Sequence, residues 1–125
     1  MKAICTICSE QKLKNTESLP IWKKYQSLRI LEVRNIANSL LMPFFLISGK
    51  FGLINEDEQI GYYDHMLVEH EAPALAKLLK LQIKENNITE LHFYAKPRDQ
   101  SWAPYYDALE QACKESNLPY FIHPV

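Results

Sequence analysis

Four short apolar runs alternate with three helical segments along the chain, and this alternation limits the fold more than any other feature. The predicted strands cover residues 3–8, 44–48, 90–95 and 120–123. The predicted helices, whose apolar residues recur every three or four positions, cover residues 22–41, 73–86 and 104–116. Such alternation is typical of a parallel sheet with right-handed crossovers and helices on its faces. We therefore predict an α/β fold with Rossmann-like layers, built on a mostly parallel four-stranded sheet with about three helices.

The size of the chain fits one domain. With 125 residues, of which 47% are hydrophobic, the chain has enough apolar side chains for a core without disulfide bonds. No linker, internal repeat or low-complexity segment divides it. We predict a single α/β domain over residues 1–125.

Charge and cysteine content narrow the function classes. The chain has fourteen basic and fifteen acidic residues, and its net charge of −1 creates no general attraction for nucleic acid. Nucleic-acid binding therefore requires a local basic patch. The first apolar run is too short for a signal peptide, and no run is long enough to span a membrane. The three cysteines are an odd number, which favours reduced thiols. We expect a cytoplasmic protein without membrane association.

The three glycines, Gly49, Gly52 and Gly61, all lie just after the second predicted strand. Glycine is typical of positions that need a positive φ or a close approach to the backbone. We expect at least one of Gly49 and Gly52 to have a positive φ or a backbone in close contact with a neighbouring group. The segment after residue 48 is interpreted as a long loop, either a functional one or a structural crossover with tight turns.

Three motifs resemble a family of small bacterial domains of unknown function. Residues 48–54 read Ser-Gly-Lys-Phe-Gly-Leu-Ile, and residues 60–64 read Ile-Gly-Tyr-Tyr-Asp, with Tyr62 where the family usually has proline. Residues 8–12 read Cys-Ser-Glu-Gln-Lys, similar to the family's first loop. A related pattern occurs in the YaaA-like peroxide-stress proteins. The resemblance implies an α/β domain with a role related to nucleic acids or nucleobases, and it implies no particular reaction.

Polar residues follow the predicted strands. In open parallel sheets, ligands bind beyond the carboxyl ends of the strands, so these residues define one candidate rim for an anionic or planar polar ligand. Nearby aromatic residues such as Trp102 offer faces for stacking a base. The alternative is that these are ordinary polar surface loops. The candidate ligand-binding residues are Cys8, Ser9, Lys12, Ser48, Gly49, Lys50, Gly52, Tyr63, Asp64, Lys96 and Arg98.

Neither a metal nor a cofactor is predicted. The Cys-x-x-Cys spacing of Cys5 and Cys8 lacks the second ligand pair of a zinc site, since the remaining cysteine, Cys113, lies on a predicted helix. The histidines do not share a metal-binding spacing, and His92 lies inside a predicted strand. We expect structural, reduced cysteines and no metal cluster.

Three functions remain open from sequence. The first is binding of a nucleobase, a nucleotide or a nucleic acid at the rim. The second is a small enzyme of the glycosyl- or nucleotide-handling kind, for which Asp64 is the candidate acid or base. The third is a non-catalytic protein-interaction domain. Because one fold supports many functions, fold class does not choose among them.

Overall fold

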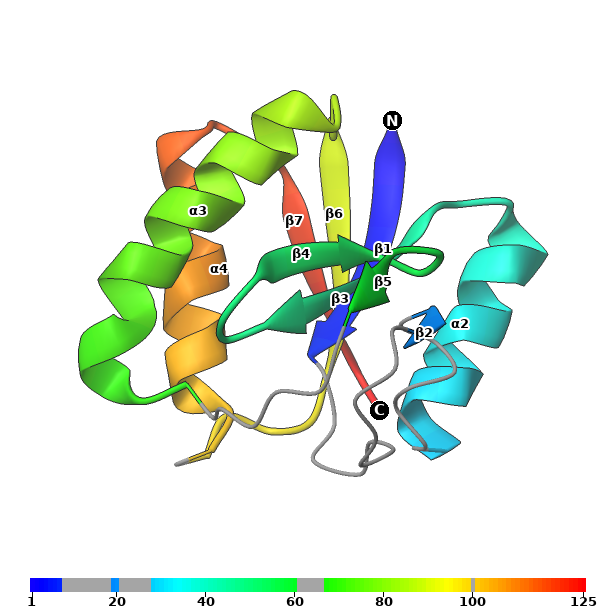
Figure 1. Ribbon diagram of the computed structural model, residues 1–125, viewed down its shortest axis with the longest axis horizontal. Coiled ribbons are helices and arrows are strands. Elements are labelled where there is room, and N and C mark those ends of the chain that lie inside the picture. The colour runs from blue at the N-terminus through cyan, green and yellow to red at the C-terminus, as the bar shows by residue number, and fades with distance from the viewer. Residues whose placement is uncertain (8–18, 21–27, 61–66, 100) are drawn as a thin grey trace.

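A mostly parallel sheet forms the centre of the protein (Figure 1). The structure, a computed structural model, describes residues 1–7, 19–20, 28–60, 67–99 and 101–125. In this part of the chain, five strands make one sheet in the order β4-β3-β1-β6-β7. The strands are β1 (Lys2–Ile7), β3 (Phe44–Ser48), β4 (Gly52–Asn55), β6 (Glu90–Ala95) and β7 (Tyr120–Pro124). Strands β3, β1, β6 and β7 run parallel, which confirms the α/β class.

The predicted strand number was wrong, because β4 pairs antiparallel with β3 where the sequence indicated a loop. The turn after Ser48 reverses the chain at once, so that Ser48 pairs with Gly52 across the hairpin. Strand β4 has four residues, with a glycine at one end and Asn55 at the other. Such a short run between turn-forming residues does not stand out as a strand in sequence. A second, two-residue pairing joins β2 (Leu19–Pro20) to β5 (Gln59–Ile60).

Three α-helices lie in the described part of the chain, as predicted: α2 (Leu28–Leu40), α3 (Ala72–Glu85) and α4 (Ala103–Glu115). A 3-10 turn, η1 (Glu69–Glu71), precedes α3. Residues 21–27 of the first predicted helix lie outside the described residues. After each helix, one residue takes a left-handed conformation and ends it: Leu41, Asn87 and Asn117, with φ of 55°, 55° and 53°.

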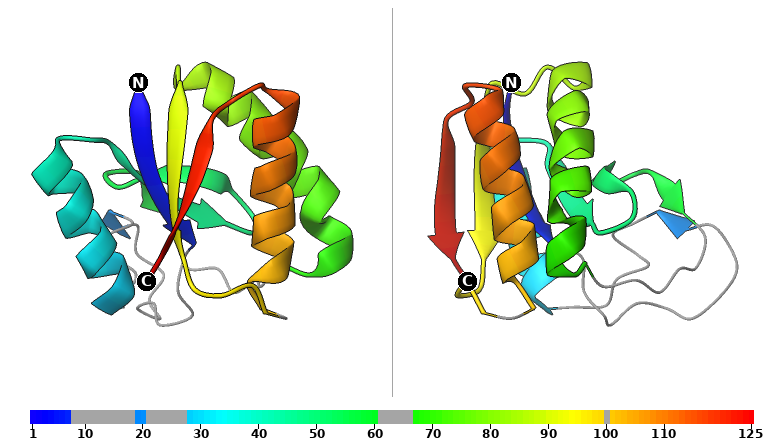
Figure 2. Two further views of the ribbon diagram at one scale, coloured as in Figure 1. Left: turned by 180° about the vertical axis from the view of Figure 1, so that it is seen from behind. Right: turned by 90° about the vertical axis from the view of Figure 1, so that its left-hand side faces the viewer.

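Helices cover both faces of the sheet (Figure 2). Helices α3 and α4 pack together on one face, and α2 lies on the other. Alternate residues of β1 divide between these layers. Cys5 belongs to the larger core cluster under α3 and α4, whereas Ile4 packs with Ile30 and Val33 of α2. The centre of the sheet is therefore buried on both faces, with one apolar cluster on each side.

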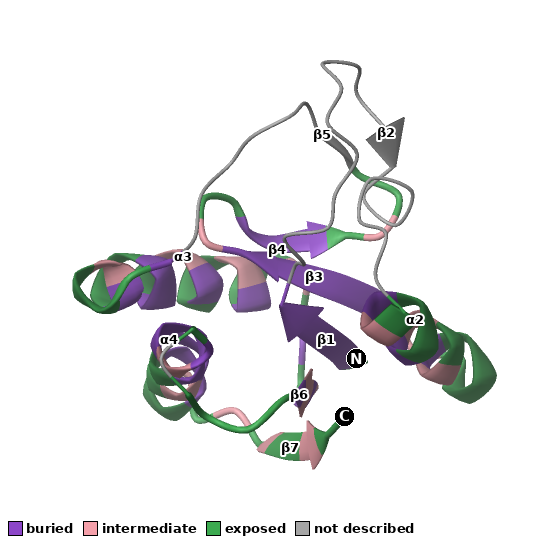
Figure 3. Cartoon of the chain, turned by 90° about the horizontal axis from the view of Figure 1, so that it is seen from below, coloured by how far each residue is buried: buried purple, intermediate pink, exposed green. Residues whose placement is uncertain are grey.

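The α2 layer covers less of the sheet than the α3–α4 layer does. Helix α2 packs against β1 and β3, while β6 and β7 lie to one side of it (Figure 3). Phe121 of β7, paired with His92 of β6, is 47% exposed. We call the α2-side surface of β6 and β7, which carries Glu90, His92, Tyr94, Phe121 and His123, the open face. No helix in the described residues is long and apolar enough to cross a membrane.

Candidate functional site

The carboxyl ends of four parallel strands point to one edge of the sheet. For β1, β6 and β7 this edge is at the bottom of Figure 1. The last strand residues there include Ile7, Ser48 and Ala95. This is the rim at which open α/β sheets bind ligands. The sequence-predicted residues Cys8, Ser9, Lys12, Tyr63 and Asp64 lie outside the described residues, and their roles stay predictions.

Ser48 shapes the rim from within. Its side chain is fully buried, and its Oγ accepts hydrogen bonds from the backbone N–H groups of Lys50 (3.1 Å) and Phe51 (3.0 Å). A serine hydroxyl that accepts bonds two and three residues ahead stabilises a tight turn. Ser48 therefore holds the β3–β4 turn and places Lys50 at the surface.

Gly49 lets this turn pack closely on its neighbours. A Cβ at Gly49 would lie 3.3 Å from the Tyr105 hydroxyl and 3.3 Å from the Leu67 backbone nitrogen. The same hydroxyl accepts a hydrogen bond from the Leu67 N–H (3.3 Å). The β3–β4 turn, the segment leading to η1 and the first turn of α4 thus meet at Tyr105.

Gly52 confirms the prediction about the glycines, since its φ is +70°. In this conformation the start of β4 lies against Gln82 of α3. The Gln82 side chain accepts a hydrogen bond from the Leu53 N–H (2.7 Å) and donates to the carbonyls of Phe51 (3.0 Å) and Leu53 (3.2 Å). One amide side chain thereby forms hydrogen bonds with the backbone groups at the outer edge of β4 and fixes the hairpin to α3.

Arg29 is the rim residue that sequence reasoning missed. From the first turn of α2, its Nη1 donates to Thr6 Oγ1 (2.6 Å) and to the carbonyl of Ile7 (3.0 Å) at the end of β1. Its guanidinium lies 4.9 Å from the centre of the Trp102 ring. Thr6 is fully buried and in turn donates to the Tyr94 carbonyl (2.7 Å). A cation is therefore fixed at the end of the central strand.

Trp102 supports Arg29 and does not form an exposed platform. Only 7% of the residue is exposed, and its ring also packs near Phe93, with centroids 6.2 Å apart. A guanidinium over an indole ring gains cation–π attraction and loses conformational freedom. The stacking role that the sequence suggested for Trp102 is thus taken by Arg29.

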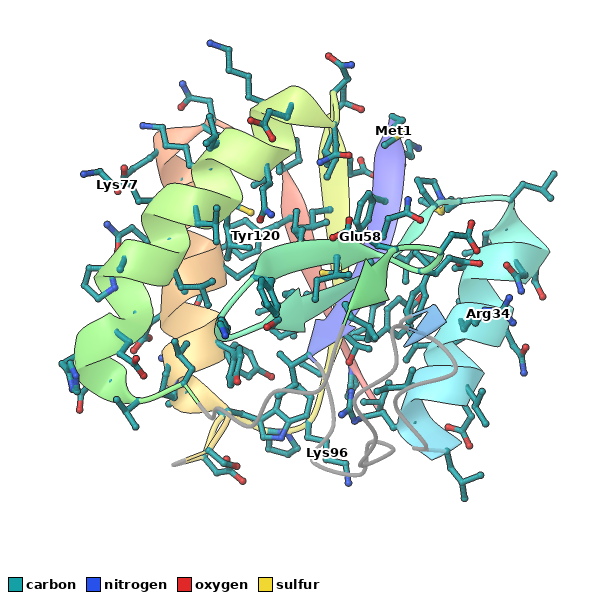
Figure 4. The ribbon with its side chains drawn as sticks, in the orientation of Figure 1. Met1, Arg34, Glu58, Lys77, Lys96 and Tyr120 are labelled. Carbon is teal, nitrogen blue, oxygen red and sulfur yellow. The ribbon has the colours of Figure 1, made fainter. Side chains whose placement is uncertain are left out.

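Two lysines flank Arg29 on the neighbouring strands. Lys50 follows β3 with its Nζ 5.2 Å from the Phe51 ring, and Lys96 follows β6. Both are exposed, and Lys96 points away from the body of the protein (Figure 4). Neither forms an ion pair with another described residue. We call Arg29, Lys50 and Lys96 the rim cations.

Arg98 is directed toward α4 instead. It forms ion pairs with Asp107 (2.5 Å) and with Glu110, and its guanidinium lies 5.0 Å from the Tyr106 ring centre. Its charge is therefore matched by two carboxylates of the helix. We do not count it among the rim cations, although it was predicted from sequence to lie in the site.

Asp99 is likewise occupied by its own chain. Its Oδ1 accepts hydrogen bonds from the backbone of Trp102 (2.9 Å) and from both the N–H (3.0 Å) and hydroxyl (2.9 Å) of Ser101. These hydrogen bonds lower the pKa of Asp99, and the bond from the Trp102 backbone has the largest effect. Asp99 thus stabilises the turn before α4, as an ionised acceptor without a spare proton for acid catalysis.

A hollow of about 430 Å³ lies beside the rim, between the start of η1 and the start of α4. The described candidate residues Ser48 and Lys50 are not among its lining residues. Its charged groups are acidic. The lining residues are Leu67, Val68, Glu69, Ala103, Pro104 and Asp107.

A second polar cluster occupies the open face. His92 Nε2 lies 2.7 Å from Glu90 Oε2, and His92 Nδ1 lies 2.8 Å from His123 Nε2. The His123 ring stacks on Tyr94, with centroids 4.5 Å apart. The hydrogen bond from His92 lowers the pKa of Glu90. The pKa of His123 is also lowered, mainly by burial and to a smaller extent by the nearby His92. The available sequence signal was the Glu-x-His spacing, since residues two apart in a strand share a face.

The described cysteines are consistent with inert thiols. Cys5 and Cys113 are free and buried, and burial raises the pKa of Cys5 and that of Cys113, the latter to about 12. A thiol with so high a pKa is a poor nucleophile and metal ligand. Cys8 lies outside the described residues. Among the residues that are described, no three His, Cys, Asp or Glu side chains come together as metal ligands.

In comparisons with known proteins, no family model, no curated protein and no solved structure matches this chain. The family resemblance of residues 8–12, 48–54 and 60–64 therefore stays a prediction. The fold and the described side chains carry the functional argument.

The His123 environment predicts a pH-dependent stability. Because its folded pKa lies below the unfolded value, its contribution is complete above the ordinary pKa of about 6.5 and declines as pH falls through the folded pKa. Denaturant unfolding between pH 7.5 and pH 5 should show this decline. His123→Gln should flatten the curve in that range, and His70→Gln, at an exposed histidine, should leave it unchanged. An equal slope in all three proteins would contradict the prediction.

Proposed function

We propose that the protein binds an anionic, nucleotide-type ligand at the C-terminal rim of its sheet. The observation that carries this proposal is the gathering of the three rim cations at the ends of three adjacent strands. Arg29 is held at the end of β1, with Lys50 following β3 on one side and Lys96 following β6 on the other. Neighbouring strands are about 5 Å apart, so the residues that follow these three strands share one edge of the sheet.

The chemistry of the three side chains differs in a useful way. Arg29 is anchored by Thr6, Ile7 and Trp102, so little conformational entropy is lost when it meets an anion. The lysines are mobile point charges that add attraction without fixing geometry.

A binding role is favoured over a catalytic one for the described part of the rim. The Asp99 carboxylate, which follows β6, is committed to hydrogen bonds within its own turn. Asp64 remains the sequence-predicted candidate for an acid or base, and Tyr63 the candidate for contact with a base. The proposal rests on neither of them.

Titration with a graded set of ligands tests the proposal. We expect pyrophosphate, a nucleoside triphosphate and a short single-stranded oligonucleotide to raise the melting temperature, and an uncharged nucleoside to have little effect. Lys50→Ala and Lys96→Ala should each weaken binding and lower the slope of log affinity against log salt by about one. Lys77→Ala, at an exposed lysine of α3, is the matched control.

The arginine needs a separate comparison, because it also supports the fold. Arg29→Lys keeps the charge and loses the planar contact with Trp102, whereas Arg29→Gln loses both. We expect a weakening of about tenfold for the glutamine variant, with the lysine variant between it and the wild type. If no anion binds, or if Lys77→Ala weakens binding as much as Lys50→Ala and Lys96→Ala, the rim is not the binding site.

A further inference from the structure

The two histidines of the open face meet through nitrogen atoms that both serve as metal ligands in proteins. His92 and His123 come from neighbouring strands and sit diagonally, because His92 pairs with Phe121 and Tyr94 pairs with His123. Their rings are inclined by only 25°, so the facing edges carry the 2.8 Å contact between His92 Nδ1 and His123 Nε2. This pair lies on the open face of the sheet, and the function proposed above does not use it.

Glu90 determines which nitrogen of His92 carries the proton. A carboxylate accepts hydrogen bonds, so His92 holds its proton on Nε2, which lies 2.7 Å from Glu90 Oε2. Nδ1 of a neutral His92 is then unprotonated and accepts from the Nε2–H of His123. One imidazole lone pair therefore already points at the second ring.

We propose that His92 Nδ1 and His123 Nε2 form a binding site for a divalent transition-metal ion of the zinc type. Two nitrogens at ordinary zinc distances in a tetrahedral site are about 3.3 Å apart. The two rings must therefore separate by about 0.5 Å, and the His123 proton must move from Nε2 to Nδ1. No net proton is released when both rings are neutral, because the proton only changes nitrogen.

Glu90 completes the arrangement as a positioning residue. Metal-bound histidines commonly donate their second ring N–H to a carboxylate, which fixes the ring and increases its basicity. Here the carboxylate is in place, and Lys2 lies 3.8 Å from the same oxygen. The side chains of His92 and Glu90 are 21% and 23% exposed, so water can reach the pair.

The site has two protein ligands, in agreement with the finding that no three metal-binding side chains gather in the described residues. Water supplies the remaining positions, and the ion is exchangeable. Imidazole pairs suit Zn²⁺, Ni²⁺ and Cu²⁺, whereas Mg²⁺ prefers oxygen ligands. The proposal therefore includes selectivity for Zn²⁺ over Mg²⁺.

Zinc titration of the untagged full chain tests the site. We expect one exchangeable Zn²⁺ per chain at pH 7.5 and no competition from Mg²⁺. His92→Ala and His123→Ala should each weaken zinc binding at least about tenfold, and Glu90→Gln about tenfold. His70→Ala is the control, since His70 is exposed and lies in η1. Circular dichroism should show that all variants are folded.

An NMR measurement separates direct ligation from an indirect effect. Long-range ¹H–¹⁵N spectra should show the His123 proton on Nε2 without zinc and on Nδ1 with zinc, while His70 stays unchanged. The proposal is overturned if the wild type binds no zinc, or if the His92→Ala/His123→Ala double variant binds it as tightly. Zinc that survives in the double variant and is released by thiol alkylation would assign the metal to cysteines instead.

Discussion

Replacing Gly52 by alanine should lower the free energy of unfolding by about 4 kcal/mol. Gly52 has a φ of +70°, and this left-handed conformation costs a residue with a Cβ about 1 kcal/mol. The new Cβ would clash with Gln82 Oε1 and would lie 3.0 Å from Leu78 Cδ2. The Gln82 side chain must then leave and give up its hydrogen bonds to the β4 edge, each of which contributes about 1 kcal/mol. Urea unfolding measures the sum.

Two further variants separate the strain from the lost hydrogen bonds. Gly49→Ala is the matched control, because its Cβ would make contacts of 3.3 Å and its φ is not positive. Gln82→Ala removes the obstructing side chain. In the Gln82→Ala background, Gly52→Ala should cost only the conformational part, about 1 kcal/mol. A Gly52→Ala variant as stable as Gly49→Ala would show that the hairpin does not depend on this conformation.

The regular part of the fold is readable from sequence because its signals are local. Residues 44–48 and 90–95 are continuous apolar or alternating runs, and they form β3 and β6 with the predicted bounds. Helices α3 and α4 have strong apolar periodicity, and a proline in the first turn of each marks its start. Such patterns depend on neighbours a few residues away, which is why they predict structure well.

Strand β4 is a different case, because its stability comes from outside the segment. Four residues form too little structure to persist alone, and the hairpin is completed by Gln82, a residue 29 positions after Leu53. The sequence predicted that at least one of Gly49 and Gly52 has a positive φ or a close approach to the backbone, which a glycine permits. It did not show that the freedom serves a strand, since the side chain that satisfies that strand belongs to a distant helix.

The position of a residue in the chain decides whether a sequence pattern can predict that it lies at the rim. Lys50 and Lys96 follow predicted strands, so topology alone places them at the rim. Arg29 lies inside a helix, and its role arises from contacts with Thr6, 23 positions earlier, and with Trp102. Arg98 follows a strand as predicted, but the carboxylates of α4 attract it away. Side-chain direction at a rim is therefore decided by tertiary partners, which single-sequence patterns do not contain.

Thr6→Val should destabilise the protein by about 2 kcal/mol and weaken anion binding at the rim at the same time. Valine has nearly the same shape as threonine, so the fully buried position stays filled. The hydroxyl, however, links two partners: it donates to the Tyr94 carbonyl (2.7 Å) and accepts from Arg29 Nη1 (2.6 Å). Removing it leaves a buried carbonyl without this donor and a guanidinium without one acceptor, a loss that typically costs 1–3 kcal/mol.

Thr6→Ser separates the hydroxyl from the methyl group. Serine keeps both hydrogen bonds and loses one buried methyl, so it should cost about 1 kcal/mol and leave ligand binding near the wild-type value. Thr6→Val keeps the methyl group and removes one of the three contacts that hold Arg29, so more of the guanidinium's motion must be lost when an anion binds. Unfolding curves and pyrophosphate titrations of both variants give the comparison. If valine lowers stability and leaves the anion affinity unchanged, Thr6 supports the core alone, and the Thr6–Arg29 contact does not prepare the rim for its ligand.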